Sequence, residues 1–301
     1  MSAPADHPAR LAVGVVGVGR VGATLGAALE RAGHRLVGVS GVSAASRRRA
    51  AQRLPDVEVL PAEDVVRRAG LVLLCVPDDA LPHVVDGLVA QDAFRAGQLV
   101  AHTSGRHGLE VLAPATGVGA LPLCLHPVMT FAGGPEDLDR LGGAPFGITA
   151  PPELRPVAEA LVLEMGGEPV AVPEDARVLY HAALAWAANY LVTLTTTAID
   201  LLRTSGVTSP EALLRPLLEA GLANALARGD DALTGPVARG DAGTVAAHLA
   251  ELRRHAPSVV PAYVALARLT ADRALQSGRL DTTLAEPLLD VLADRRAESA
   301  P

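Results

Sequence analysis

The stretch GVVGVGRVG at residues 14–22 decides how the first part of this chain is expected to fold. It joins an apolar strand-like run, residues 11–16, to an amphipathic helical run at residues 21–32, and a further strand is expected at 35–40. Its glycines have the G-x-G-x-x-G spacing, which permits a tight turn, close approach to a pyrophosphate and close packing of helix on strand. The expected cofactor contacts are Gly17, Val18, Gly19, Arg20, Val21 and Gly22. Because strand and helix flank the glycines on the correct sides, the stretch predicts a dinucleotide site rather than a chance glycine-rich turn.

Composition narrows the class of protein. The 301 residues are 50% hydrophobic and carry a net charge of -7, which argues against general nucleic-acid binding. The chain contains no lysine, so no lysine can act as acid, base or Schiff-base former. Cys75 and Cys124 lie in apolar, strand-like segments, which fits a reducing compartment. With no signal-peptide pattern and no apolar run of ~20 residues, we expect a cytoplasmic protein without membrane contact.

The first half of the chain alternates β-rich runs with helical runs. Strands are expected at 11–16, 35–40, 57–60, 71–76, 98–102, 119–124, 145–149 and 168–172. Helices are expected at 21–32, 43–53, 62–68, 79–90, 107–113 and 152–165. This alternation predicts an α/β domain over residues 10–173, with a doubly wound, mostly parallel sheet.

The second half shows no convincing strand. Helices are expected at 174–204, from the N-cap Ser209 to Gly229, from Asp241 onward, at 258–277 and at 283–295. We therefore assign residues 174–297 to an all-helical domain for substrate binding and dimerisation.

The loop after the second strand predicts which dinucleotide binds. NAD sites usually carry an acidic residue ~20 residues after the glycines, but no Asp or Glu lies between Glu30 and Asp56. Hydroxyl and guanidinium groups, which suit a 2′-phosphate, are present instead. These groups belong to Ser40, Ser43, Arg47 and Arg48. We predict NADP(H), with NAD(H) as the alternative; one or two of the arginines in this run are expected simply to face solvent.

Two further turns are expected at the carboxyl edge of the sheet. The run CVPD places Val76, Pro77 and Asp78 above the cofactor, although Asp78 could equally cap the following helix. The run HTSG places Ser104 at the same rim, beside the expected nicotinamide position.

With these pieces assembled, the chain resembles a family of Rossmann-like oxidoreductases with an additional helical domain of formerly unknown function. This family is related to pyrroline-5-carboxylate reductases and 6-phosphogluconate-dehydrogenase-like enzymes, and includes an alternative type of ketopantoate reductase. The matching stretches are GVVGVGRVG, CVPD, HTSG, LHPVMTF (125–131), YHAALAWAANYLVTL (180–194) and ALTGPVARGD (232–241). The resemblance implies a nicotinamide-dependent reductase, a homodimer formed through the helical domain, and a site between the two domains.

His181 and Asn189 share the long helix expected at 174–204. Eight residues bring both side chains to one side of a helix. Histidine suits proton donation to a developing alkoxide, and an asparagine amide suits binding of that oxygen. From spacing alone, a core histidine is the better interpretation of His181; the resemblance reverses this preference. His126 is either a substrate contact or a strand terminus with a fixed turn.

The loop TGPVARGD, residues 234–241, offers a substrate anchor. Arg239 is its only cation and could clamp a carboxylate as a fork, with Thr234 nearby. The alternatives are a structural Arg239–Asp241 pair or a dimer contact, and Asp241 is expected to cap the next helix. No cluster of His, Cys and Asp has zinc-like spacing, so no metal site is expected.

Taken together, the sequence predicts an NADPH-dependent reductase of a small 2-oxo acid carboxylate, with ketopantoate the leading candidate. The alternatives are a cyclic imine reductase of the pyrroline-5-carboxylate type and a non-catalytic regulator that binds NADP(H).

Overall fold

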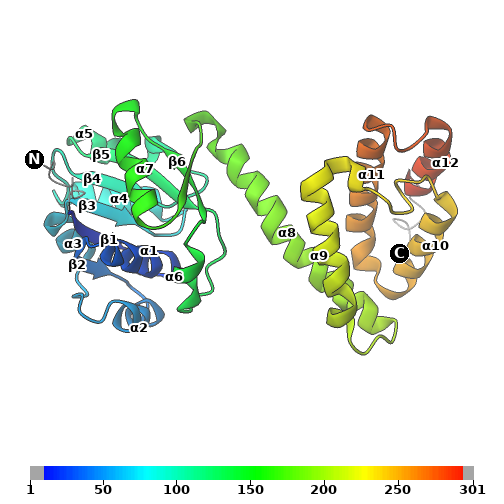
Figure 1. The fold of residues 1–301 in the computed structure, drawn as a ribbon, viewed down its shortest axis with the longest axis horizontal. Coiled ribbons are helices and arrows are strands. Elements are labelled where there is room, and N and C mark those ends of the chain that lie inside the picture. Colours follow the sequence, from blue (N-terminus) through cyan, green and yellow to red (C-terminus); the bar gives the residue numbers. More distant parts are fainter. Residues whose placement is uncertain (1–9, 294–301) are drawn as a thin grey trace, which may run out of the picture. The chain divides into compact units, whose positions relative to one another are not determined.

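Seven strands form one sheet in the N-terminal part of this computed structural model, which describes residues 10–293 (Figure 1). The strands are β1 (Ala12–Val16), β2 (Arg35–Ser40), β3 (Leu71–Leu74), β4 (Leu99–His102), β5 (Leu121–Pro127), β6 (Pro145–Thr149) and β7 (Glu168–Ala171). Their order is β2-β1-β3-β4-β5-β6-β7, and only the β5–β6 pair is antiparallel. The predicted α/β class with a mostly parallel sheet is confirmed.

The chain reverses its direction across the sheet at β1. Because β1 lies between β2 and β3, the connections that follow β1 and β2 lead toward opposite edges. In sheets of this type, ligands bind outside the carboxyl ends of the strands beside such a switch point. A ligand site is therefore expected at the carboxyl ends of β1 and β3.

The prediction of a strand at 57–60 is wrong. Only a single parallel bridge forms, between Val59 and Val39 of β2. The run is too short for a ladder because Pro61, directly after it, is already the N-cap of a helix. The bridge nevertheless sits on the free side of β2, where the expected strand would have paired.

Helices pack on both faces of the sheet. Along β1, Val13 and Val15 belong to one apolar core and Val16 to another, as the alternation of side chains in a strand requires. Helices on the first face are α1 (Arg20–Arg31), α2 (Ala44–Arg53) and α7 (Arg155–Glu164). Helices on the second face are α3 (Ala62–Arg68), α4 (Leu81–Ala90) and α5 (Ala113–Gly117). The layers place the helix that follows β1 directly against the sheet.

Three helix predictions in this part need correction. The helix expected at 79–90 starts at Leu81, after a turn. The run at 107–113 forms a 3-10 helix, Leu109–Leu112, before α5. The short helix α6 (Glu136–Arg140) was not predicted. The buried carboxylate of its Asp137 accepts from the N–H groups of Ala132 and Gly133, a contact that has no periodic signal in the sequence.

The C-terminal part contains only helices among its described residues. They are α8 (Arg177–Thr204), α9 (Pro210–Arg228), α10 (Ala242–His255), α11 (Val260–Gln276) and α12 (Thr282–Ala293). Three of them, α10 to α12, share one apolar core. Ser209 is the N-cap of α9 but makes no side-chain cap bond, whereas the Asp241 carboxylate accepts from the Thr244 N–H at 3.0 Å, as predicted. The expected helix end at 295 and domain end at 297 lie outside the described residues.

The division between the two units differs from the predicted boundary at residue 173. One unit extends to Asn189 and the other begins at Tyr190, so the division falls inside α8. The first turns of α8 belong to the N-terminal unit because Arg177 and Tyr180 bond to residues of the sheet. By length and composition alone, Glu174–Thr204 is the one helix in residues 10–293 that could cross a membrane, a test that core helices of soluble proteins also pass.

Candidate functional site

The glycine-rich loop forms the turn that the sequence predicts. Gly17 has a φ of +93°, and a Cβ there would lie 2.5 Å from the carbonyl oxygen of Cys75. The space around Gly19 is open, since its Cβ would meet nothing nearer than 3.9 Å. Gly19 is the N-cap of α1 and no side chain caps this end, which leaves the first N–H groups of the helix directed at a ligand position. This geometry fits a pyrophosphate.

The loop after β2 carries the groups expected to bind a 2′-phosphate. The backbone oxygen of Ser40 accepts from the N–H groups of Gly17 and Val18, at 2.9 and 2.8 Å. The Ser43 hydroxyl caps α2 by accepting from Ser46 N–H at 3.0 Å. Arg47 donates to the Val42 carbonyl at 2.9 Å, which holds its exposed guanidinium over this loop.

Ser40 therefore has a structural role that the sequence did not predict, because its carbonyl oxygen connects the loop after β2 to the glycine-rich loop by hydrogen bonds. Arg48 is exposed on α2, as expected for a solvated arginine.

Arg20, one of the predicted cofactor contacts, links the glycine-rich loop to a loop further along the chain. Arg20 donates to the Phe131 carbonyl at 3.4 Å, in the loop that follows β5. A Cβ on Gly133 in that loop would lie 3.3 Å from Arg20 and 3.6 Å from Nε of Arg49. Arg20 and Arg49 thus flank the same loop residue and add positive charge near the expected phosphates.

The turn after β3 connects to the turn after β4. Val76 lies against Gly17, and the backbone oxygen of Asp78 bonds Nε2 of His107 at 3.1 Å. The Asp78 carboxylate lies 3.8 Å from Nε of Arg106. The alternative in which Asp78 caps the following helix is wrong, because α4 has Ala80 as its N-cap and no side-chain cap.

Ser104 and His102 fix the turn after β4. The Ser104 hydroxyl accepts from His107 N–H at 3.1 Å, and Ser104 N–H donates to Nδ1 of His102 at 3.2 Å. Nε2 of His102 then donates to the Gly108 carbonyl at 2.9 Å, so this imidazole is neutral. Burial lowers the pKa of His102 to about 4. Ser104, only 4% exposed, holds the loop; its predicted contact with substrate stays a prediction.

His126 lies at the carboxyl end of β5, which runs three residues further than expected. Its Nδ1 is 2.8 Å from the hydroxyl of Tyr180 in α8. Its ring meets that of His181 edge to face, with centroids 6.0 Å apart. A Cβ on Gly105, in the turn after β4, would lie 2.5 Å from His181 and 2.9 Å from Nε2 of His126. The two imidazoles therefore lie close to the backbone of Gly105, where only a glycine fits. We call His126, Tyr180 and His181 the histidine cluster.

Electrostatics keep His126 uncharged. Burial lowers its pKa to about 4, and the positive charge of Arg177 acts in the same direction. Burial raises the pKa of the Tyr180 hydroxyl, while the Arg177 charge opposes this shift. At neutral pH the cluster therefore offers an un-ionised phenol bonded to a neutral imidazole.

Arg177 is the largest fully buried side chain of the described residues, at 1% exposed. Its Nε donates to the Thr149 hydroxyl at 2.8 Å and Nη2 to the Gly147 carbonyl at 2.9 Å. Its third nitrogen, Nη1, is buried without a hydrogen-bond partner in residues 10–293. The guanidinium carbon lies 5.5 Å from the centroid of the Tyr180 ring.

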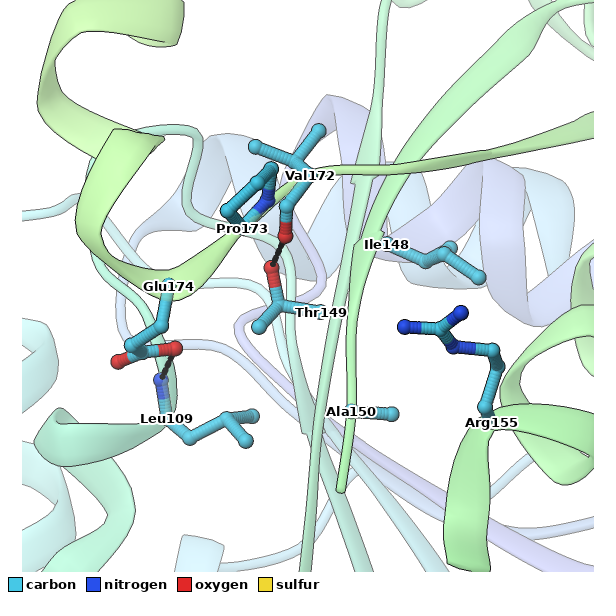
Figure 2. A pocket seen from close by; sticks show the side chains of 8 residues that line it. All are labelled: Leu109, Ile148, Thr149, Ala150, Arg155, Val172, Pro173 and Glu174. Carbon is cyan, nitrogen blue, oxygen red and sulfur yellow. Dashed lines mark hydrogen bonds between the residues drawn. The ribbon is translucent and has the colours of Figure 1, made fainter. Parts of the chain in front are cut away.

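A pocket of about 360 Å³ is lined by eight residues, among them Thr149, Arg155 and Glu174 (Figure 2). Thr149, which accepts from Arg177, lines it and donates to the Val172 carbonyl at 2.6 Å. Glu174 lines it too and accepts from Leu109 N–H at 2.8 Å. None of the predicted site residues lines this pocket, so it is not the predicted site.

Asn189 is separated from the histidine cluster. It lies eight residues after His181 on α8, which is ~12 Å along the helix axis. Its predicted contact with the reacting oxygen remains untested by this geometry. Thr234 and Arg239 belong to the other unit, where the exposed Arg239 donates to the carbonyl of Thr234. The structure thus brings Arg239 and Thr234 together, and the role of this pair toward a carboxylate remains a prediction.

Sequence reasoning missed Tyr180 and Arg177. Tyr180 directly precedes His181, but its partner His126 is 54 residues away in the chain. Arg177 looked like an ordinary solvated residue at a helix start. Its lack of an acidic neighbour within one helical turn on the C-terminal side was the only signal available.

Comparisons with known proteins agree with this arrangement. A model of a Rossmann-like domain matches residues 2–127, and a model of a domain of unknown function (DUF2520) matches residues 144–270. The two models match separate parts of the chain. No curated protein matches it. The Rossmann-like match covers the glycine-rich loop, and the DUF2520 match covers Tyr180, His181 and the loop that carries Arg239.

Solved structures share the fold over most of the chain. A candidate NADP oxidoreductase from Bacteroides fragilis has a TM-score of 0.72 at 22% identity, covering 87% of this chain and 98% of that chain. A reductive aminase from Aspergillus terreus, in complex with NADPH and ethyl levulinate, has a TM-score of 0.65 at 22% identity over 94% and 99%. The Plasmodium falciparum pyrroline carboxylate reductase, with NADP bound, has a TM-score of 0.56 at 12% identity over 92% and 98%. At these identities the likeness shows the fold.

Proposed function

We propose that this protein is an NADPH-dependent reductase of a small 2-oxo acid, with ketopantoate as the leading substrate. One observation carries the proposal. The turn of Gly17 and the open N-terminus of α1 lie at the same sheet edge as the neutral His126, at the carboxyl ends of β1 and β5. A phosphate-binding loop and groups suited to proton transfer at one edge are what a hydride transfer to a carbonyl requires. Three proteins of similar fold are a candidate NADP oxidoreductase, a pyrroline carboxylate reductase with NADP bound and a reductive aminase in complex with NADPH.

The residues present fit NADPH better than NADH. The open space at Gly19 admits a pyrophosphate, and Arg20 adds charge beside it. Ser43 and Arg47, held at the end of β2, offer a hydroxyl and a guanidinium to a 2′-phosphate, and no carboxylate lies in this loop to repel it. When bound, NADPH supplies the hydride.

The protein groups then bind the substrate and handle the proton. Arg239 holds the carboxylate, and Asn189 donates to the reacting oxygen. A histidine of the cluster, His181 by the sequence-based prediction, gives or relays the proton as negative charge develops on that oxygen. Because the chain has no lysine, an imidazole or a phenol is assigned the role of proton donor.

A cyclic imine is the second candidate substrate. It is favoured by the likeness to pyrroline carboxylate reductases, including that of Streptococcus pyogenes at a TM-score of 0.57 and 18% identity. The same carboxylate clamp and hydride donor serve that reaction. A regulator that binds NADP(H) without turnover is the third candidate.

We also propose a homodimer formed through the helical unit. Several large apolar side chains of α8 and α9 are exposed in the single chain, more than a monomer surface usually leaves in one region. They are Trp186, Tyr190, Leu191, Val192, Leu194, Leu213, Leu217, Leu222 and Leu226. A second copy of the chain that covers these side chains would remove them from water.

Oxidation of NADPH by the purified protein, followed by absorbance, tests the proposal. Ketopantoate, pyrroline-5-carboxylate and simple 2-oxo acids are compared, each with NADPH and with NADH. Turnover of ketopantoate with NADPH preference is expected. Turnover of the imine alone would favour the second candidate, and NADPH binding without any turnover would favour the regulator.

A further inference from the structure

The histidine cluster contains a hydroxyl, and a buried cation lies against the cluster; the proposed reaction has so far given neither group a role. Tyr180 bonds His126 from the side of α8, and Arg177 lies against the ring of Tyr180. Each of these residues belongs to the N-terminal unit, as does the glycine-rich loop. The contacts therefore do not depend on the placement of the helical unit.

The Tyr180–His126 bond can form with either group as the donor, and the direction in which the phenol donates suits proton transfer. A neutral imidazole has one nitrogen that donates and one that accepts. When the phenol donates to Nδ1 at 2.8 Å, the His126 proton resides on Nε2. Nε2 has no hydrogen-bond partner among residues 10–293, and it faces the backbone of Gly105 at the carboxyl end of β4. The cluster thus presents an N–H donor toward the sheet edge, backed by a second proton on Tyr180.

Arg177 is suited to stabilise a negative charge on Tyr180. It is 1% exposed, and no carboxylate forms an ion pair with it in the described part of the chain. Two of its nitrogens bond neutral oxygens, of Thr149 and Gly147, so its charge is not compensated. A buried cation without a counter-ion is costly unless a neighbouring group carries negative charge at some stage. The phenolate of Tyr180, with its ring 5.5 Å from the guanidinium, is such a group.

We propose that Tyr180 and His126 form a proton relay to the reduced oxygen, and that Arg177 is the positioning residue which stabilises the relay. This inference rests on the proposed reductase function. As the hydride adds to the carbonyl carbon, the π-electron pair of the C=O bond moves to oxygen. That oxygen takes the proton from Nε2 of His126, while Nδ1 takes the proton of the Tyr180 hydroxyl. The substrate gains one hydride and one proton, the imidazole stays neutral, and the phenolate left beside Arg177 recovers its proton from solvent.

The relay and an imidazolium donor such as His181 predict different pH profiles. The relay needs a neutral His126, whose pKa is about 4, and a protonated Tyr180, whose pKa is raised. Its kcat is therefore constant across the neutral range and falls only in the alkaline range. An imidazolium donor would make kcat fall as the pH rises through the neutral range.

The test compares Tyr180→Phe with a matched control. Tyr263 and His248 form the same kind of pair in the helical unit, with the hydroxyl 2.9 Å from Nδ1, so Tyr263→Phe removes an equivalent bond elsewhere. With NADPH and ketopantoate, Tyr180→Phe is expected to lower kcat by about 10²-fold or more, with an unchanged Kd for NADPH and loss of the alkaline limb. Tyr263→Phe is expected to leave kcat unchanged. His126→Asn keeps a partner for Tyr180 but cannot pass a proton across a ring, so it should match Tyr180→Phe.

The outcomes separate the relay from the function on which it rests. Wild-type turnover with an unchanged kcat in both Tyr180→Phe and His126→Asn would overturn the relay alone. So would a wild-type kcat that falls through the neutral range. If the wild-type protein binds NADPH but reduces neither ketopantoate nor pyrroline-5-carboxylate, the proposed function fails and the relay fails with it. Should Tyr180→Phe not fold, His126→Asn and the wild-type pH profile decide.

Discussion

Gly17 packs directly against the backbone of Cys75: a Cβ on Gly17 would lie 2.5 Å from the Cys75 carbonyl oxygen. The contact joins the turn after β1 to the turn after β3, on the two sides of the switch point. It makes Gly17 a requirement of the fold itself. Gly19, whose Cβ would meet nothing nearer than 3.9 Å, is required only if a ligand occupies the open space.

The two glycines therefore give a first prediction with its own control. Gly17→Ala is expected to lower both thermal stability and NADPH affinity, because a side chain at a φ of +93° is strained and meets backbone. Gly19→Ala is expected to keep the wild-type Tm while weakening NADPH binding. Calorimetric titration and thermal unfolding measure both. Normal NADPH affinity in Gly19→Ala would show that the cofactor does not approach this loop.

Arg47 carries the second prediction, on cofactor choice. Its guanidinium is held over the loop after β2 by the bond to the Val42 carbonyl. Arg47→Ala should raise the Kd for NADPH by about 10- to 100-fold, the loss expected for a charge-assisted bond, and leave the Kd for NADH unchanged. Arg53→Ala, in the last turn of the same helix, is the control. An equal loss for both cofactors would rule out a contact with the 2′-phosphate.

The third prediction concerns acid stability and the buried His102. Its pKa in the folded protein is about 4, below the usual value of 6.5, so the unfolded chain binds its proton more readily. Protonation of His102 therefore does not affect the free energy of unfolding above pH ~6.5. As the pH drops toward 4, this one residue lowers the free energy of unfolding by up to ~1.4 kcal/mol per pH unit. His102→Gln should lower stability at neutral pH and flatten this slope. Urea unfolding at several pH values measures how the free energy of unfolding depends on pH. His83→Gln, at an exposed position of α4, is the control. The same pH dependence in His102→Gln as in the wild type would contradict the lowered pKa of His102.

The fourth prediction tests the homodimer. Leu217 on α9 is 68% exposed, and Leu163 on α7 is 61% exposed in the other unit. Leu217→Asp should shift the sedimenting species from dimer to monomer, since a carboxylate cannot be buried in an apolar interface at low cost. Leu163→Asp should remain dimeric. A wild-type protein that sediments as a monomer at micromolar concentration would contradict the proposal.

Much of the fold could be predicted because it depends on local patterns. The glycine spacing at 14–22 and the alternation of apolar runs predicted all seven strands to within three residues, and the helical half followed from caps such as Asp241. The strand at 57–60 failed because Pro61 stops the run before a ladder can form. Propensity alone does not show how far pairing extends.

The candidate site was only partly predictable because its contacts are long-range. His126 and His181 could be named as candidates, but their approach across Gly105 could not be read from spacing. Tyr180 reaches a partner 54 residues away, and Arg177 reaches a carbonyl 30 residues away. For Arg177 the sequence offered only the lack of an acidic neighbour within one helical turn on its C-terminal side, and exposed arginines occupy the same kind of helical position.

The missing side chain at Gly105 offers a way to control this protein by design. A single methyl group at that position would fall between two imidazoles, 2.5 Å from His181 and 2.9 Å from Nε2 of His126. In Gly105→Ala, the added methyl group is expected to block the approach to both rings and to leave the glycine-rich loop intact. Residue 105 is therefore the position at which the smallest added side chain is expected to obstruct both histidine rings.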